Sequence, residues 1–416
     1  MGKASRLLTP GFFLKHKNMT MKTFFRSSNM AKKALLLGLS LLIITLVSGC
    51  ATWKEKYSAD FPVAQCLPSF PDKDGWYGGD GAYSITLDKE RTLWLFGDTF
   101  VSREAGRKDR IGMDVVMGTT VAISTCGENG QFQIQYFLKK KNGKYISSFG
   151  KNEWLWPQDP FIVNQVLYVP LLVVKAMLDL SEPLNFKIVR HKIARIKNYT
   201  LTDPRQWIVD YIDLKEAIPP GIEAFATTSV IFQNYVYFYP LYNSVKKTVR
   251  TSGNILVRVP VNKLDDPANF MEYLSKGGTW EKGLAPARAM IILSAGVSEL
   301  SVRYHADDNK WIAVYMSTKN YGAQLLYQTA DKPEGPWSKP MALIATIPEV
   351  DPKSPRYDKH NFCYAGKEHI EFARSKNLVV TYVCNSAENF KKKNNFIRRN
   401  LFLYRPVVKN IRFLLD

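Results

Sequence analysis

Two Gly-Asp pairs frame the stretch GDGAYSITLDKERTLWLFGDTF, which runs from Gly79 to Phe100. Asp80 stands directly before the first apolar run, and Asp98 follows the second. If the runs pair as an antiparallel hairpin, the DKER turn lies at one end and both carboxylates lie at the other. Paired carboxylates are what glycoside hydrolysis needs, because one protonates the leaving oxygen and the other acts as base or nucleophile. The alternative is that each aspartate only caps its own turn.

A third carboxylate, Glu299, stands at the start of an apolar run in SAGVSELSVRYHADDNKWIAVY. Arg303 follows four residues later, so in a strand the two side chains lie on one face. We therefore expect Glu299 to complete the catalytic group with Asp80 and Asp98, where it tunes a pKa or binds a hydroxyl. Arg303 is then a substrate-binding cation beside it. A buried ion pair between Glu299 and Arg303 is the alternative.

Other side chains are candidates for substrate contact. Trp76 and Tyr77 precede the Gly-Asp hairpin, Asp159 follows two tryptophans in WLWPQDPFIVNQVLYVPL, and His360 begins the stretch HNFCYAGKEHIEF. Aromatic rings can stack on sugar faces, although a buried core role would also explain them. The histidines and glutamates of the last stretch lack a third ligand at metal-binding spacing, so we predict no metal and no cofactor.

The elements that must position these residues are short β-strands. Runs rich in Val, Ile, Tyr, Phe and Trp alternate with turns of Gly, Asn, Asp and Pro, and helical periodicity is weak. A strand–turn–strand pattern recurs at residues 76–135, 152–200, 222–262, 288–346 and 356–407. This recurrence predicts an all-β fold, a five-bladed β-propeller over residues 75–407, with a two-sheet sandwich as the alternative. In a propeller, acids at strand ends of separate blades converge on one channel.

The N-terminus carries an export signal. The stretch MAKKALLLGLSLLIITLVSGC has a lysine-bearing start, an apolar core of signal-peptide length, and VSGC, which resembles a bacterial lipobox with Cys50 as the lipid acceptor. We therefore predict a leader and lipoprotein signal peptide over residues 1–50, a tether over 51–74 and a tail over 408–416. The expected location is the bacterial cell envelope, with a palmitate-bearing anchor in the outer membrane. An uncleaved membrane anchor is the alternative.

Cysteine usage agrees with export. Apart from Cys50, the chain has Cys66, Cys126, Cys363 and Cys384, an even number that permits two disulfides in an oxidising compartment. Cys363 and Cys384 lie on runs that we expect to be neighbouring strands, so we pair them, and Cys66 with Cys126 follows by elimination. Four buried thiols are the alternative.

Charge and composition limit the partners. The chain has 57 Lys and Arg against 37 Asp and Glu, a formal charge of +20, and eight of those cations lie in the predicted leader. A basic chain is attracted to anionic surfaces, but no compact basic motif of a nucleic-acid-binding fold is present, so we expect no nucleic-acid partner. The high aromatic content of 13% suits β-structure or carbohydrate contact.

Three stretches together resemble a known family. They are GDGAYSITL with TLWLFGDTF, SELSVRYHADDNKWIAVY, and TADKPEGPW. The family was first described only as a domain of unknown function, and some of its members are endo-D-arabinanases; in outline the chain is also similar to the five-bladed propeller glycosidases. The resemblance covers about residues 75–405. It implies a glycan cleft at the channel mouth, with acidic site residues at Asp80, Asp98 and Glu299. The basic charge, the insertion over 184–211 and the lipid signal depart from the family and leave the sugar open.

These observations predict an exported lipoprotein that hydrolyses a furanoside or another cell-envelope polysaccharide. The alternative is a non-catalytic propeller that binds a glycan or protein at the outer membrane, and a scaffold for envelope assembly is a third reading. Convergence of the three acids on one open pocket would favour the enzyme. Acids that point into separate turns would favour the binding module.

Overall fold

The computed structural model describes residues 66–177, 186–246, 249–374, 376–388 and 394–414. The predicted signal peptide and Cys50 lie outside these residues. Almost all of the described secondary structure is β-strand, so the all-β prediction is confirmed. Seven helical segments of three or four residues complete the described structure: Pro204–Gln206, Lys215–Ala217, Val261–Lys263, α2 (Pro267–Phe270), Pro348–Val350, Ile370–Phe372 and α3 (Phe396–Arg399). In the described part of the chain no helix is long and apolar enough to span a membrane.

The first sheet contains the Gly-Asp hairpin. Its strands are, in order across the sheet, β2 (Tyr83–Thr86), β3 (Arg91–Phe96), β6 (Thr120–Cys126) and β7 (Phe132–Tyr136). The same segments bend and continue as an extension of the first sheet, formed by β1 (Trp76–Gly79), β4 (Thr99–Val101) and β5 (Asp114–Val116). A separate hairpin follows, β8 (Lys139–Lys141) with β9 (Lys144–Ile146). The bends therefore fall at the two Gly-Asp pairs.

Four further sheets follow along the chain. The second sheet comprises β10 (Trp154–Pro157), β11 (Phe161–Val163), β12 (Val166–Ala176), β13 (Phe186–Ile196) and β14 (Asp210–Asp213). The third comprises β16 (Ser229–Phe232), β17 (Tyr235–Phe238), β20 (Val257–Pro260), β21 (Glu272–Leu274) and β22 (Trp280–Lys282). It too bends into an extension, formed by β15 (Ile222–Ala224), β18 (Leu241–Lys246), β19 (Val249–Ile255) and β23 (Ile291–Leu293).

The fourth and fifth sheets complete the set. The fourth comprises β24 (Leu300–His305), β25 (Lys310–Met316), β26 (Leu325–Ala330) and β27 (Met341–Ile344). The fifth comprises β28 (Asn361–Glu368), β29 (Asn377–Ser386) and β30 (Val407–Arg412). All strand pairs in the described sheets are antiparallel, as expected for strands that short turns connect.

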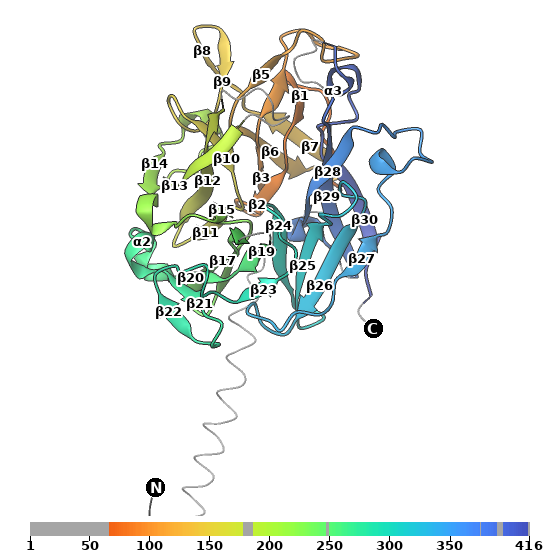
Figure 1. Cartoon of the computed structure of the whole chain (residues 1–416). Helices are drawn as coiled ribbons and strands as arrows, with labels where there is room; N and C mark the ends of the chain where they lie inside the picture. Colours follow the sequence, from red (N-terminus) through yellow and green to blue (C-terminus); the bar gives the residue numbers. More distant parts are fainter. Residues whose placement is uncertain (1–65, 178–185, 247–248, 375, 389–393, 415–416) are drawn as a thin grey trace, which may run out of the picture. The chain divides into compact units, whose positions relative to one another are not determined.

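The sheets succeed one another around a centre (Figure 1). Contacts run from β3 to β10, from β11 to β16, from β16 to β24 and from β24 to β28. The fifth sheet then returns to the first, because the Ser84 hydroxyl bonds to Nδ1 of His369 at 2.6 Å and Trp94 stacks on Phe372. Buried apolar clusters fill the space between successive sheets, for example Leu95 with Leu167. The segments closest to the centre therefore come from widely separated parts of the sequence.

Both predicted disulfides are present. Cys66 is bonded to Cys126 on β6, and Cys363 on β28 is bonded to Cys384 on β29, directly opposite in the strand register. The first bond fixes the described end of the predicted tether, where Phe70 also packs in the core beside Trp94. From residue 66 onward this segment is part of the folded unit, contrary to the tether prediction. The predicted tail is also wrong in its first residues, because β30 pairs with β29 as far as Arg412.

Candidate active site

The two Gly-Asp pairs lie side by side at the bend of the first sheet. The backbone N–H of Asp80 donates to the Asp98 carbonyl at 3.0 Å, and the Gly97 N–H donates to the Asp80 carbonyl at 2.7 Å. Gly81 adopts a φ of +61°, a conformation that a glycine takes without strain. The hairpin therefore brings both aspartates to the same end, as the sequence predicted.

Asp98 is held by three N–H donors. Its Oδ1 accepts from the Gly118 backbone at 2.6 Å, from the Trp154 indole at 2.8 Å and from the Trp156 indole at 2.9 Å. The residue is 8% exposed, and burial raises the pKa of its carboxyl to about 7, although the three donors oppose the shift. The two tryptophans, considered above for sugar stacking, thus hold this acid through their indole nitrogens.

Asp80 lies between β1 and β2 and faces the fifth sheet. Its Oδ1 accepts from the Tyr364 hydroxyl at 2.5 Å, and the hydroxyl of Tyr404 and the Gly81 backbone N–H also bond to the carboxylate. Burial raises the pKa of Asp80, and these donors together with the charge of Lys367 oppose the rise. Asp80 is thus half-buried in a setting that supplies several donors to its ionised form.

Glu299 reaches the same place from the fourth sheet. It directly precedes β24, and its Oε1 lies 3.2 Å from the point that a Cβ on Gly81 would occupy. Burial raises the pKa of Glu299 to about 7; the charge of Lys367 lowers it and the charge of Asp80 adds to the rise. Carboxyls from the first and fourth sheets therefore interact electrostatically, as a channel lined by separate sheets would require.

Asp159 and Arg303 form a buried clamp instead of a substrate contact. The Arg303 guanidinium donates to both oxygens of Asp159, at 2.9 and 3.0 Å, and Asp159 also accepts from the Thr228 hydroxyl and the Ser229 backbone. Asp159 is 2% exposed. Neither predicted arrangement of Arg303 is correct, because its partner is Asp159 of the second sheet and Glu299 takes no part in the pair.

Three other predicted contact residues lie elsewhere. Trp76 is fully buried and stacks on Tyr136, and Tyr77 is buried with its hydroxyl donating to the Glu104 carbonyl. Neither ring offers a free face to a sugar. His360 stands at the exposed edge of the fifth sheet, where its ring bonds to Asp358 at 3.0 Å. Burial therefore contradicts the expected substrate contacts of Trp76 and Tyr77, and the contact expected of His360 stays a prediction.

Three site residues escaped the sequence analysis. Tyr364, Lys367 and Tyr404 surround Asp80, and the first two come from the stretch CYAGKEH of β28. The available signal was a lysine within a mostly apolar strand, since lysine is rarely buried without a partner. The direction of the Lys367 side chain depends on an irregularity in the register of β28, which the amino-acid composition does not reveal.

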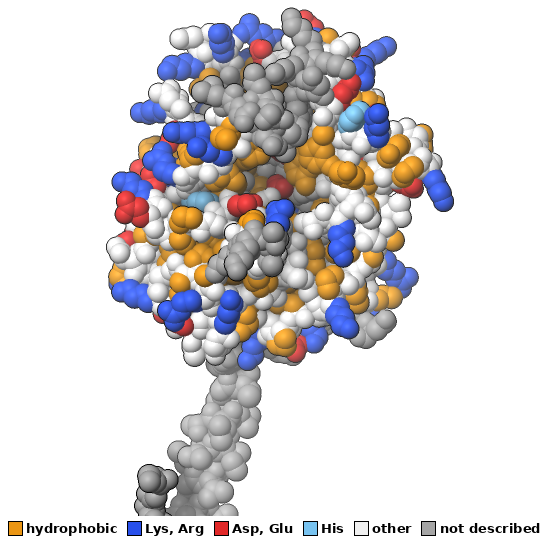
Figure 2. All heavy atoms as spheres, viewed as in Figure 1, with side chains coloured by type: hydrophobic (Ala, Val, Ile, Leu, Met, Phe, Trp, Pro, Cys, Tyr) orange, Lys and Arg blue, Asp and Glu red, His pale blue; other side chains and the backbone are white. Residues whose placement is uncertain are grey.

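The face of the molecule seen in Figure 2 is recessed near its middle. Figure 2 shows acidic side chains and a cationic one around a hollow near the middle of the visible face, among hydrophobic atoms. A separate hollow of about 610 Å³ lies beside β7, β8 and β9, where Tyr136, Lys139, Tyr145 and Arg205 line it. None of Asp80, Asp98 and Glu299 contributes to that second hollow, so it is distinct from the candidate site.

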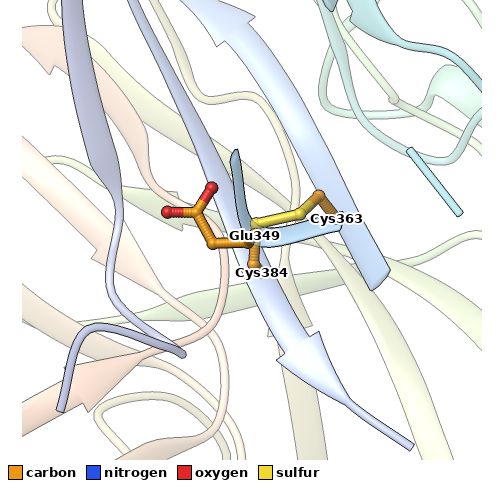
Figure 3. Close-up of side chains that lie close together, drawn as sticks. All are labelled: Glu349, Cys363 and Cys384. Carbon is orange, nitrogen blue, oxygen red and sulfur yellow. A yellow bond between two sulfur atoms is a disulfide. The ribbon is translucent and has the colours of Figure 1, made fainter. Parts of the chain in front are cut away.

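One group of potential metal ligands occurs among the described residues. Glu349, Cys363 and Cys384 lie close enough to share an ion (Figure 3). The two sulfurs are joined to each other, so neither can supply the thiolate that a metal needs. The Glu349 carboxylate instead pairs with Arg356 at 3.1 Å and accepts from the Tyr382 hydroxyl. This group is structural.

Comparison with known proteins places the chain. Residues 69–412 match the model of a family described as "Domain of unknown function (DUF5005)". The chain belongs to this family. The predicted resemblance to a family described as a domain of unknown function is confirmed. Endo-D-arabinanase activity stays a prediction for this DUF5005 protein. No curated protein sequence matches the chain.

Solved structures are similar to this DUF5005 chain to different degrees. The structure described as "a putative hydrolase from Bacteroides ovatus" has a TM-score of 0.60 and 16% identity, covering 80% of this chain and 85% of that chain. An alpha-L-arabinanase mutant from Cellvibrio cellulosa has a TM-score of 0.43 and 11% identity, covering 82% and 93%. The GH43_1 enzyme from Xanthomonas citri complexed with xylotriose has a TM-score of 0.39 and 12% identity, covering 77% and 86%. Only the first has a TM-score above 0.5, and at 16% identity it supports a shared fold alone.

Proposed function

We propose that this DUF5005 protein is a glycoside hydrolase, built on a five-bladed β-propeller, that acts on a furanoside or another cell-envelope polysaccharide. The observation that carries the proposal is the meeting of Asp80 from the first sheet with Glu299 from the fourth. Both are half-buried, and both have pKa values raised by burial. Titratable groups shifted in this way gather at catalytic sites.

The surroundings divide the roles. Asp80 receives bonds from two tyrosine hydroxyls and a backbone N–H, all of which favour its ionised form. Glu299 has no such donors among the causes of its pKa, which burial raises to about 7, so it keeps a proton near neutrality. Glu299 then donates that proton to the glycosidic oxygen as the C–O bond breaks, while Asp80 acts as base toward water or as nucleophile.

Asp98 takes a supporting role in this assignment. From the sequence, Asp98 was expected to share the acid–base roles with Asp80, but its Oδ1 is occupied by three donors. Its backbone carbonyl also fixes the N–H of Asp80. Asp98 therefore holds the bend of the hairpin and places a second carboxyl near Asp80.

The protein is further proposed to be an exported lipoprotein, anchored through Cys50 in the outer membrane. The lipobox-like VSGC carries this part of the proposal. Two disulfides in the folded unit support an oxidising compartment. Labelling with a palmitate analogue tests it: incorporation by the natural chain and none by Cys50→Ser supports the anchor, and equal labelling contradicts it.

The activity is tested by sugar release from a panel of glycans. Linear arabinan, xylotriose and β-1,3-galactotriose are suitable first probes, because structurally similar proteins are described with such sugars or activities. Release by the natural protein and a loss of about 100-fold or more in Asp80→Asn is expected. Asp88→Asn is the matched control, since Asp88 lies in the exposed turn at the opposite end of the same hairpin. No release from any envelope or plant glycan would favour the non-catalytic binding module.

A further inference from the structure

Lys367 is a buried cation at the centre of the site. It lies on β28 and is 2% exposed, and no hydrogen-bond acceptor contacts its Nζ among the described residues. The ammonium lies over the ring of Tyr83, 3.3 Å from the ring centroid. A buried charge of this kind is costly unless opposite charges compensate it.

A strand irregularity directs Lys367 inward. The register between β28 and β29 shifts between Tyr364 and Lys367, and Ala365 between them adopts a φ of +55°. Such bulges re-aim side chains and are frequent beside active sites. Gly366 is required there, because a Cβ would lie 2.8 Å from the backbone nitrogen of Met316. The irregularity lets Tyr364 bond to Asp80 while Lys367 lies beside the same acid.

The charges that face Lys367 come from three elements. Its Nζ lies 4.0 Å from the position of a Cβ on Gly81, the same point that Oε1 of Glu299 approaches to 3.2 Å. Asp80 and Glu299 are the unpaired acids that act on it. Asp159 and Arg303 also act on it, with opposite signs, and they neutralise each other as an ion pair.

We infer that Lys367 is a positioning residue that makes Asp80 and Glu299 hold a single proton between them. In these three side chains together, one ammonium, one carboxylate and one carboxylic acid carry no net charge. The Asp98 carboxyl also acts on Asp80, and burial raises its pKa to about 7. Two carboxylates would leave a net negative charge, and two carboxylic acids would leave the ammonium uncompensated. The singly protonated state is also the one that glycoside hydrolysis requires, so the inference rests on the proposed function and deepens it.

The state of Lys367 agrees with this role. Burial lowers the pKa of Lys367 to about 8, and the negative charge of Glu299 opposes the fall, so the side chain is mostly an ammonium at pH 7. Tyr83 and Tyr364, which also face the cluster, have pKa values raised well above 10 and stay neutral. Burial holds the pKa of nearby His369 well below its usual range, so it adds no charge.

The test is the pH profile of kcat/KM for Lys367→Met, which removes the charge and keeps an unbranched side chain. The ammonium lowers the pKa of both carboxyls, so its removal raises both and moves both limbs to higher pH by about one unit or more. Lys367→Arg keeps a cation and should return the limbs toward their natural positions. Lys139→Met is the matched control, because Lys139 is a half-buried lysine of β8 that bonds to the Ser148 carbonyl.

A titration without substrate separates this inference from the proposed function. Carbon-13 NMR of labelled aspartate and glutamate should show the same upward shifts in Lys367→Met, or in Lys367→Gln if the methionine variant does not fold. The inference would be overturned if Lys367→Met left both limbs of the pH profile and the carboxyl titrations unchanged and only reduced the amount of folded protein. Shifted titrations without hydrolysis of any glycan would support it and contradict the proposed function.

Discussion

At the scale of single residues, the site depends on which polar atoms reach the carboxylates. Asp98, Asp80 and Asp159 each lie in the connection between two strands, and their partners differ in charge. Indole and backbone N–H groups hold Asp98, hydroxyls hold Asp80, and a guanidinium holds Asp159. A neutral donor opposes the rise in pKa without abolishing it, whereas a guanidinium engages a carboxylate as an ion pair. The first two acids therefore remain able to exchange protons.

Trp156→Phe tests this distinction. The change keeps an aromatic ring and removes one indole N–H from Asp98, so the pKa of Asp98 should rise above its value of about 7 by roughly one unit. Carbon-13 NMR titration of labelled aspartate measures the shift. Trp337→Phe is the control, because the Trp337 indole N–H has no partner among the described residues. An unchanged Asp98 titration in Trp156→Phe would contradict the account.

At the scale of elements, the site is built where strands depart from regularity. Asp80 and Asp98 lie where the first sheet bends into its extension, and Lys367 follows the shift in register of β28. The clamp of Asp159 and Arg303 then joins three sheets, because Asp159 also binds Ser229 of the third. The regular parts of the strands supply the core, and the irregular parts supply the chemistry.

We expect the ion pair of Asp159 and Arg303 to contribute mainly to the stability of the fold. Arg303→Met leaves the Asp159 carboxylate buried without its counterion, so the free energy of unfolding at pH 7 should fall by about 3–5 kcal/mol. The double variant with Asp159→Asn should lose distinctly less. Urea denaturation measures both.

The exposed pair of Lys310 and Asp331 provides the control for the clamp, and Asp331→Asn should cost about 0–1 kcal/mol. Equal losses in the single and double clamp variants would show that the ion pair is not what joins the sheets.

At the scale of the whole molecule, the sequence was most informative where a property repeats. The alternation of apolar runs and turns predicted the all-β fold, and each recurring span contains most strands of one principal sheet, although β14, β21, β22 and most of β30 lie beyond the spans. Neighbouring strands also justified pairing Cys363 with Cys384. Contacts between distant segments could not be predicted from the sequence. The residues around Arg303 do not indicate its ion pair with Asp159. The stretch WYGG likewise does not indicate that the Arg405 guanidinium lies over the ring of Trp76.

The raised pKa values also predict how global stability depends on pH. Burial raises the pKa of Asp98 and of Glu299 to about 7, above the values of an unfolded chain, so the folded state binds these protons more tightly. Their contribution is complete below about pH 4 and is lost as the pH rises through about 7. Glu299→Gln should therefore flatten this fall and be more stable than the natural protein at pH 8, by about 1–3 kcal/mol.

Urea denaturation between pH 5 and 8 measures this effect. Glu90→Gln, at an exposed position of the first hairpin turn, is the control and should follow the natural protein. The prediction would be contradicted if Glu299→Gln were less stable than the natural protein at pH 8 and its free energy of unfolding fell with pH as steeply.

The proposed roles are that Glu299 donates a proton to the glycosidic oxygen and that Asp80 acts as base toward water or as nucleophile. Hydrolysis of two substrates by Glu299→Gln tests these roles most sharply. One is the glycan found in the screen, and the other is the 2,4-dinitrophenyl glycoside of the same sugar, whose leaving group needs no proton. We expect the hydrolysis rate of Glu299→Gln to fall about 100-fold or more on the glycan and to change little on the dinitrophenyl glycoside. On the dinitrophenyl glycoside, the alkaline limb of the pH profile should disappear. Equal losses on both substrates, or disappearance of the acidic limb instead, would contradict the proposed roles.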